Sequence, residues 1–342
     1  MAERAGAGAY AWRTGCVLVA LGAFLLVTGI MLRTYVYDHV SVLPLGMHSV
    51  EKLHATGATF FDPSIVATRS GLDVTATSTL RGERHPGLGG VAVFDSFLAV
   101  QASDGTPIEF MQSRMALDRH TGMLVNCCGT NVAGNYRVRQ SGLGFKFPFF
   151  AAKTTYEMFN SDVARPVPVY YAGQQTIDGM QVYRYVEELP PSQVGLMRVP
   201  PSIMGLPRSQ NEITVRKIVA TTETFWVDPV IGAPVKIEEN THQWLLTRDG
   251  THRLPVFAAD FRQTPQDVAA SVRQYRLQTS QLYMLRNLLP PASVIGGIAL
   301  FALGVLLAFR GVRRRRSLAP APRARRQAVT EVGEPLDDLT AG

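Results

Sequence analysis

The sequence predicts a mainly β (α+β) extracytoplasmic domain, a twisted antiparallel sheet or sandwich, flanked by N- and C-terminal transmembrane helices. Two uninterrupted apolar runs lie near the two ends of the 342-residue chain. Between them, stretches rich in β-branched and aromatic residues alternate with turns of Asp, Gly and Pro, a pattern typical of strands. The third observation is that more than half of the net charge of +7 comes from a tail of arginines after the second run.

The first apolar run covers residues 15–32 and lies between Arg13 and Arg33. It is long enough to cross a bilayer, which takes about 18 to 20 apolar residues. No small-x-small cleavage pattern follows it, which favours an uncleaved anchor over a signal peptide. The second run, 290–309, is of similar length. We therefore expect transmembrane helices at residues 14–33 and 288–309.

The arginine-rich tail gives the orientation. Residues 310–326 include eight arginines and no acid, and basic segments of this kind remain in the cytoplasm. Residues 1–13 are then cytoplasmic too, and residues 34–287 form the extracytoplasmic β-rich domain. The tail, 310–342, lacks apolar periodicity and is expected to be disordered. The predicted location is the cytoplasmic (plasma) membrane.

The basic run also has an interpretation beyond topology. Basic side chains beside a membrane attract anionic inner-leaflet lipids, by about 1 kcal/mol for each charge near the surface. The predicted anionic-lipid contacts are Arg313, Arg314, Arg315 and Arg316. A charge excess of this origin does not indicate nucleic-acid binding.

Glycines recur every seven residues along both apolar runs. The first run has Gly15, Gly22 and Gly29, and the second has Gly297 and Gly304. Such a repeat keeps one face in register along a left-handed helix pair, and small residues let helices in lipid approach closely. The repeat predicts that the two spans pack together; the alternative is that glycine is simply common in membrane helices. Neither apolar run, 15–32 or 290–309, contains a charged residue, which indicates anchors rather than the lining of an ion path.

The region between the runs is predicted to be mostly strands. Apolar and polar residues alternate at 72–80, and further β-rich stretches follow at 91–102 and 108–118. Two turns, 118–122 and 228–232, share an Asp at their start and a Gly at their end. This shared pattern is a weak indication of an internal duplication.

One helix is predicted in the outer region. Thr264 suits its cap, Pro265 its first position and Asp267 its first turn. The helix should lead directly into the second span near residue 290.

The segment 189–207 is unusual because it combines prolines with many large apolar residues. The prolines are expected to exclude a central strand. One interpretation is a loop that packs on the sheet. The other is an apolar lip that contacts a lipid or a partner through Leu196, Met197 and Met204.

Two of the three cysteines, Cys127 and Cys128, are adjacent, and the third, Cys16, lies in the first span. Three interpretations compete: a disulfide between the neighbours, two buried free thiols, and a redox or metal site. The oxidising compartment favours the disulfide. Redox pairs usually separate their thiols by two residues, and the histidines do not complete a metal motif.

The sequence lacks the common catalytic and nucleotide-binding motifs, G-x-S-x-G, H-E-x-x-H, the Walker loop and G-x-G-x-x-G. We therefore expect a protein that is not an enzyme, with no catalytic residue, no cofactor and no metal. A hydrolase whose residues are scattered along the chain is the third-ranked alternative.

Several short motifs together resemble the actinobacterial porin PorA family of two-span envelope membrane proteins. They are FDP at 61–63, LDRHTG at 117–122, NCCG at 126–129, GLGFKFPF at 142–149 and WVDPVIGAPV at 226–235. The last departs from the family's Asp-Pro-x-Thr-Gly form at Ile231. The resemblance implies an actinobacterial cell-envelope protein, with some relatives linked to traffic of envelope glycolipids, and it supplies no catalytic residues.

The function predicted from these features is a non-catalytic, membrane-anchored envelope protein. It would bind or help to traffic an envelope lipid or glycolipid, or dock a membrane transporter, and nucleic acid is not an expected partner. The predicted lipid contacts in the aromatic stretch are Phe145, Phe147, Phe149 and Phe150. The alternative is self-association into an oligomeric, porin-like pore, although two featureless spans do not line a channel alone and a membrane barrel needs lipid-facing strands.

Overall fold

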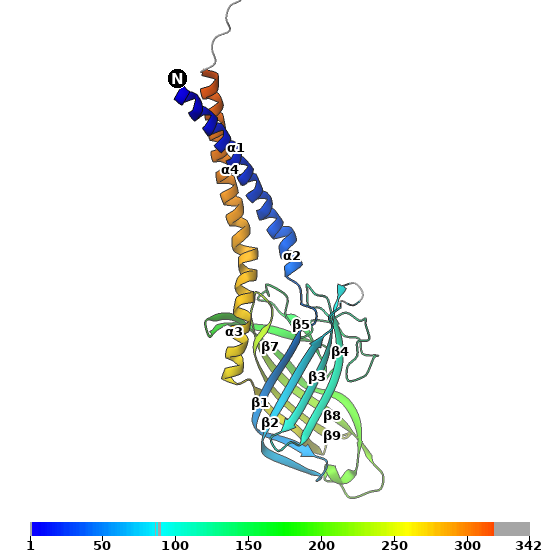
Figure 1. Ribbon diagram of the computed structural model, residues 1–342. Helices are drawn as coiled ribbons and strands as arrows, with labels where there is room; N and C mark the ends of the chain where they lie inside the picture. The colour runs from blue at the N-terminus through cyan, green and yellow to red at the C-terminus, as the bar shows by residue number, and fades with distance from the viewer. Residues whose placement is uncertain (1, 86, 88–89, 318–342) are drawn as a thin grey trace, which may run out of the picture. The chain divides into compact units, whose positions relative to one another are not determined.

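The computed structural model describes residues 2–85, 87 and 90–317, which fall into two compact units (Figure 1). One unit combines Met1–Ile30 with Pro291–Gly342, and the other is Met31–Pro290. The second unit confirms the predicted mainly β class.

The described part of the first unit consists of two helices, α1 (Ala2–Met31) and α4 (Leu289–Ser317). Both are long and apolar enough to cross a membrane. A helix suits this environment because it satisfies its own backbone hydrogen bonds where lipid offers none. α4 continues past Phe309, so residues 310–317 of the predicted tail are helical, and residues 318–342 lie outside the described part of the chain.

Glycines form the contact between α1 and α4. A Cβ atom at Gly22 would lie 2.6 Å from the backbone nitrogen of Phe301 on the other helix. Backbone atoms of the facing helix confine the other repeat glycines in the same way: Gly15, Gly297 and Gly304. Gly29 is also buried. Only a residue without a side chain permits helices to approach this closely.

Replacing Gly22 by isoleucine is expected to separate the two helices, because the new side chain would overlap the facing backbone. Crosslinking by a flexible bifunctional thiol reagent measures this, in a Cys16→Ser background, between a cysteine placed at Val19, beside Gly304, and one placed at Ala308, beside Gly15. We expect the yield in membranes to fall severalfold. Gly296→Ile is the matched control, because no atom lies within 4 Å of a Cβ built there. An unchanged yield in the Gly22 variant would show that the helix pair does not depend on this face.

Ten strands make up most of the second unit. They are β1 (His48–Asp62), β2 (Ala67–Gly82), β3 (Ala92–Ala102), β4 (Pro107–Leu117), β5 (Tyr156–Asn160), β6 (Arg165–Ile177), β7 (Met180–Val199), β8 (Ile213–Val227), β9 (Pro234–Thr247) and β10 (Arg253–Arg262).

The strands form one antiparallel sheet in the order β4-β3-β2-β1-β10-β9-β8-β7-β6-β5. The first and last strands of the chain, β1 and β10, pair in the interior of the sheet, and β4 and β5 form its two edges. The sheet curls into a half-barrel, as its strands in Figure 1 show. Right-handed strand twist accumulates over many strands and favours such curling.

The loop expected over residues 189–207 is not observed in its first half, because β7 continues to Val199, although as an edge strand and not as the central strand that the prolines exclude. Two structural features accommodate the prolines. The β7–β8 register shifts between Leu189 and Ser192, so Pro190 and Pro191 lie at a bulge. Beyond Glu187, β7 also has no pairing with β6 and is an edge strand locally. Proline is tolerated at bulges and edges, where a missing N–H leaves no ladder partner unsatisfied.

The predicted helix is α3 (Pro265–Tyr283), with the Thr264 hydroxyl accepting a hydrogen bond from the backbone N–H of Asp267. Val272 of α3 packs on the sheet against Trp226 and Val235. The chain continues as a π-helical turn, η4 (Met284–Leu288). A similar turn, η1 (Leu32–Val36), begins the unit's sequence and is followed by the short α2 (Tyr37–Val40). A second short helical turn, η3 (Pro201–Met204), follows β7.

The long segment 118–155 spans the seam between the edge strands β4 and β5. Single bridges join it to β4, at Arg114–Asn131 and Leu117–Leu124. Another bridge joins its Leu143 to Met158 of β5. The segment therefore closes the curl at one end of the sheet.

The two similar turns at 118–122 and 228–232 are held together by the aromatic part of this segment. In each turn the opening carboxylate accepts backbone N–H groups, and the closing glycine, Gly122 or Gly232, is left-handed. The backbone N–H of Gly144 donates to Gly122, and that of Phe147 donates to Gly232. The two turns and the segment between them form one hydrogen-bonded unit.

Candidate functional site

Three neighbouring strands place a row of carboxylates on the inner face of the curled sheet. Glu187 of β7 is the register partner of Glu223 of β8, and Glu223 is that of Glu239 of β9. Side chains alternate between the two faces of a strand, so these acids share a face with the buried Tyr185 and Phe225. Strand pairing, rather than a local motif, brings the three glutamates together.

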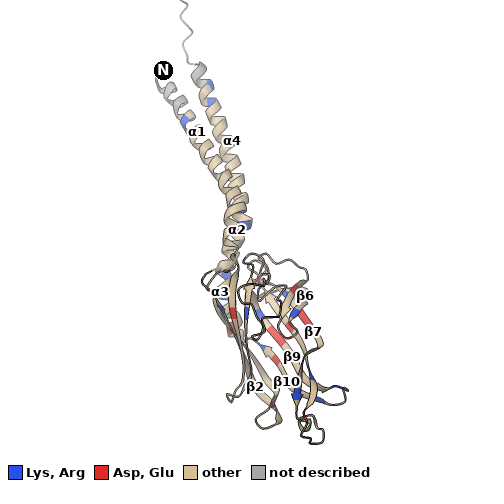
Figure 2. Cartoon of the chain, turned by 90° about the vertical axis from the view of Figure 1, so that its right-hand side faces the viewer, with Lys and Arg blue, Asp and Glu red and all other residues tan. Residues whose placement is uncertain are grey.

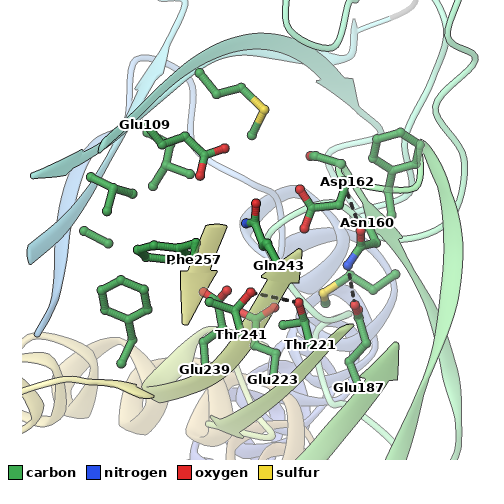
Figure 3. Close-up of a pocket in the computed structure, with 18 residues that line it drawn as sticks. Glu109, Asn160, Asp162, Glu187, Thr221, Glu223, Glu239, Thr241, Gln243 and Phe257 are labelled. Carbon is green, nitrogen blue, oxygen red and sulfur yellow. Dashed lines mark hydrogen bonds between the residues drawn. The ribbon is translucent and has the colours of Figure 1, made fainter. Parts of the chain in front are cut away.

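The following inward rows are also polar. Thr221 and Thr241 face each other across β8 and β9, with their hydroxyls hydrogen-bonded at 3.3 Å. One row further, the Gln243 side chain is directed into the open space of Figure 3. Gln243 is only 8% exposed, and its side-chain amide has no hydrogen-bond partner among the residues that the structure describes. The amide is therefore available to donate to or accept from a molecule in the cavity.

These rows form one wall of a cavity of about 220 Å³ (Figure 3). Five carboxylates line it: Glu109, Asp162, Glu187, Glu223 and Glu239. Glu109 comes from the edge strand β4, and Asp162 from the turn between β5 and β6, so acids reach the cavity from both edges of the sheet. Within the described part of the chain, no lysine, arginine or histidine belongs to the lining.

Another part of the cavity wall is apolar. It is built from β2, β3 and β10, and its residues are Ala76, Leu98, Val100, Phe257 and Phe261. Phe257 and Phe261 lie at inward positions of β10, beside Gln243 and Glu239 of β9. The cavity thus offers a polar, acidic side and a hydrocarbon side.

Burial raises the pKa of the glutamates in the row. Desolvation raises the pKa of Glu187 and of Glu239 from 4.5 to about 7. It raises the pKa of Glu223 well above its usual value, and the negative charges of Glu239 and Glu187 add to this effect. Near neutral pH the row therefore carries protons that a positively charged ligand could displace.

The two carboxylates from the sheet edges behave similarly. Desolvation raises the pKa of Glu109 and of Asp162, and the positive charge of Lys217 lowers both by a smaller amount. Lys217 is thus a basic group near the cavity, but its charge does not outweigh the burial of these acids.

The outer face of the sheet differs from the inner face. Lys236 and Glu238 form an ion pair of 2.7 Å there, and Asp260 and Arg262 form another of 2.8 Å. Figure 2 shows charged residues distributed along these strands. A strand surface with ion pairs of this kind faces water rather than lipid, because charges on a lipid-facing strand surface are strongly destabilising.

The four phenylalanines predicted to contact lipid do not gather on one surface. Phe145 packs edge-on against Phe94, with ring centroids 5.0 Å apart. Phe147 is completely buried and stacks on Tyr185 at 4.6 Å in a different core cluster.

The other two phenylalanines contact basic residues. The Phe149 ring lies 3.6 Å from the ammonium nitrogen of Lys146, which donates to a backbone carbonyl and whose pKa burial lowers to about 7. Phe150 stacks under the Arg286 guanidinium at 3.9 Å and packs edge-on against Tyr37. Arg286 also donates to the Tyr37 hydroxyl, so this group joins η4 to α2 within the second unit.

The remaining predicted lipid contacts are also dispersed. Leu196 and Met197 are 61% and 45% exposed on the part of β7 that pairs only with β8. Met204 is buried in a core cluster with Val199. Arg313 is exposed, whereas the side chains of Arg314, Arg315 and Arg316 lie outside the described part of the structure.

Cys127 and Cys128 are joined by a disulfide. Cys128 has a left-handed backbone, with φ of 62°, and its carbonyl accepts a hydrogen bond from Nε of Arg114. Both sulfurs pack against a small core cluster that includes Val93 and Ala116. The disulfide is part of the segment that spans the β4–β5 seam.

Sequence reasoning did not single out any polar residue of the cavity. A signal was present in the alternation of the strands. Glu239 continues the alternating series of buried residues Val235 and Ile237 on β9. Glu223 likewise begins the alternating series that continues with the buried Phe225 and Val227 on β8. An acid in the apolar phase of a strand must face the interior.

One comparison with known proteins covers most of the chain. A family model described as Porin PorA matches residues 14–306, which include the α1 apolar run, the whole sheet and most of α4. A search of curated proteins found no match.

Proposed function

Because the chain belongs to the porin PorA family and has two helices apolar enough to span a membrane, it is a membrane protein, and we propose that it holds the polar head group of an envelope lipid or glycolipid inside its curled sheet. The carrying observation is the carboxylate-lined cavity with the unpartnered Gln243 amide. Carboxylate and amide oxygens accept hydrogen bonds from the hydroxyl or ammonium groups of a head group. The family description is that of a porin and not of an enzyme, which supports a non-catalytic role.

The cavity suits a head group better than acyl chains. Its volume of about 220 Å³ is below the roughly 300 to 1,000 Å³ of pockets for drug-sized ligands. The apolar wall around Phe257 and Phe261 could contact the ring face of a sugar or the first carbons of a chain. The rest of the lipid would remain outside the cavity.

The proposed topology has residues 34–287 outside the cytoplasmic membrane and both termini in the cytoplasm. The arginine run of the tail supports it through the positive-inside rule. The charged outer face of the sheet supports a domain in water rather than a barrel in lipid.

Native mass spectrometry of the full-length protein in non-ionic detergent tests the head-group proposal. The wild type should carry an adduct of lipid mass. Gln243→Trp should lose it, because the larger side chain would fill the cavity, whereas His242→Trp, one residue along on the exposed face of β9, should keep it. An adduct that survives in Gln243→Trp, or a wild type that stays empty after incubation with an envelope lipid extract, contradicts the proposal.

A second candidate function is an oligomeric pore, favoured by the family description and by the acidic interior of the sheet. An interior lined by carboxylates would conduct cations in preference to anions. Single-channel recordings in planar bilayers test it. Cation-selective steps that change selectivity in Glu223→Gln would favour the pore, and a silent bilayer containing reconstituted protein would count against it.

A further inference from the structure

The glutamate row lacks an evident counter-charge. Like charges at directly opposite positions of neighbouring strands are destabilising, and here three acids face one another in succession. Glu223 and Glu239 form no ion pair or hydrogen bond with any described residue, and Glu187 accepts one hydrogen bond, from Asn160. A buried acid is stabilised either by protonation or by a positive partner.

We propose that this cavity is a binding site for an organic cation with N–H groups, an alkylammonium or amino-sugar ammonium, which donates to Glu223 and its two neighbours in the row. The proposal rests on the interior site proposed above and specifies its ligand class. The same ammonium could belong to a free amine or to the head group of an aminolipid.

Gln243 provides an observation independent of the acids. The residue is more than nine-tenths buried, and its amide is directed into the cavity and lacks a partner among the described residues. An ammonium group has three donors and no acceptor, so a ligand that places one at the glutamates and a second N–H or O–H donor two rows further along β9 can also donate to the amide oxygen of Gln243. The partner missing from Gln243 is therefore supplied by the same ligand that neutralises the row.

An organic cation fits the cavity better than a metal ion. In the part of the chain that the structure describes, no three His, Cys, Asp or Glu side chains are grouped closely enough to hold a metal. A metal ion needs its oxygen ligands within about 2.0 to 2.6 Å of one point. N–H donors on a small molecule reach separate acceptors at about 2.8 Å each and do not need them to converge.

The apolar wall favours a cation that carries carbon. Phe257 and Phe261 face the acidic rows from the neighbouring strand, β10. Aromatic faces attract alkylammonium groups, and the attached methylene groups gain from burial against Leu98 and Val100. A small bare ion would leave this wall without a contact.

Isothermal titration calorimetry of the full-length protein in non-ionic detergent at pH 7 tests the proposal, with cadaverine as the probe. We expect saturable binding that weakens at least tenfold in Glu223→Gln and in Glu239→Gln. Glu188→Gln is the matched control, because Glu188 is the exposed neighbour of Glu187 on β7 and should leave the affinity unchanged. Binding of the cation should release protons, seen as a dependence of the heat on the buffer's ionisation enthalpy.

Two further probes separate the source and the chemistry of the ligand. Dodecylamine in mixed micelles should compete with cadaverine, and a much tighter affinity than that of propylamine would point to an aminolipid rather than a free amine. Tetramethylammonium, which has charge but no N–H, should bind at least tenfold more weakly than cadaverine.

The inference is overturned if cadaverine and dodecylamine fail to bind, if their affinity is unaffected by Glu223→Gln and Glu239→Gln, or if Ca²⁺ binds more tightly through the same glutamates. If no amine binds but the wild type carries a lipid adduct that Gln243→Trp abolishes, the ligand is not an organic cation and the head-group proposal still holds. If neither amine binding nor a lipid adduct is found, the organic-cation proposal and the head-group proposal are both contradicted.

Discussion

Replacing Gly232 by alanine should lower the melting temperature of the full-length protein by about 10 °C or more. Gly232 ends the second Asp-to-Gly turn with φ of 71°, and a Cβ there would overlap the carbonyl oxygens of Phe147 and Pro148. The left-handed backbone alone costs about 1 to 2 kcal/mol for a residue with a side chain. Displacement of Phe147 adds to this, because loss of a buried aromatic side chain costs about 3 to 5 kcal/mol.

The melting temperature is read from thermal unfolding in detergent, with Gly250→Ala as the matched control. Gly250 has a similar φ of 76°, but no atom lies within 4 Å of a Cβ built there. Its variant should lose only about 2 to 8 °C, because the backbone cost of about 1 to 2 kcal/mol shifts the melting temperature of a domain of this size by about 2 to 4 °C for each kcal/mol. An equal drop in melting temperature in the two variants would show that strain of the left-handed backbone, and not the contact of Gly232 with the aromatic segment, causes the destabilisation.

The second expected result is that the protein becomes less stable as the pH rises from 5 to 7. The pKa of Glu187, Glu239 and Glu51 is raised by burial to about 7 in the folded protein, against 4.5 for the free side chain. The folded state then binds more protons than the unfolded state, so the free energy of unfolding falls with pH across this window. We expect the melting temperature to drop by roughly 5 °C or more.

Other titrating groups set the limits of this window. The pKa of Glu223, Glu109 and Asp162 is raised too, by desolvation, which gives the same sign. The pKa of Lys146 is lowered by burial to about 7, so the unfolded state binds more protons above that pH and stability should recover there. The charge of Lys217 reduces the effect at Glu109 and Asp162.

Thermal unfolding at several pH values between 5 and 7 measures this effect, with Glu223→Gln as the informative variant. The melting temperature of this variant should depend less on pH than that of the wild type, and it should be higher at pH 7. Glu188→Gln, with its exposed side chain, should reproduce the wild-type profile. A wild-type melting temperature that rises between pH 5 and 7 would contradict the raised pKa values of the buried row.

Local features of the fold could be predicted from the sequence. The helix start at Thr264 depends on three neighbouring residues, and the apolar runs depend on composition alone. The Gly15-to-Gly29 repeat likewise needs only spacing. The loop interpretation of residues 189–199 failed because tolerance of proline in a strand depends on where β6 stops pairing with β7, which is not a local property.

The site was not predicted because it depends on strand register. Glu187, Glu223 and Glu239 lie on three strands, and a shift of one residue in either pairing would turn an acid to the other face. The prediction that the phenylalanines share a lipid-contacting surface failed for a related reason. An aromatic-rich stretch indicates apolar surroundings, but not which part of the protein provides them. Phe145 and Phe147 are two residues apart and still belong to different core clusters.

The pairing of β1 with β10 has a consequence for folding kinetics. Strand partners such as His54 and Arg262 come from opposite ends of the domain's sequence, so the β1–β10 ladder closes only after nearly the whole domain has been synthesised. Contacts between such distant residues form slowly, because a long loop must first lose entropy. Association of α1 with α4 through their glycines brings the two ends of the domain together and shortens that search. A loosened helix pair should therefore delay maturation of the sheet as well as weaken the anchor.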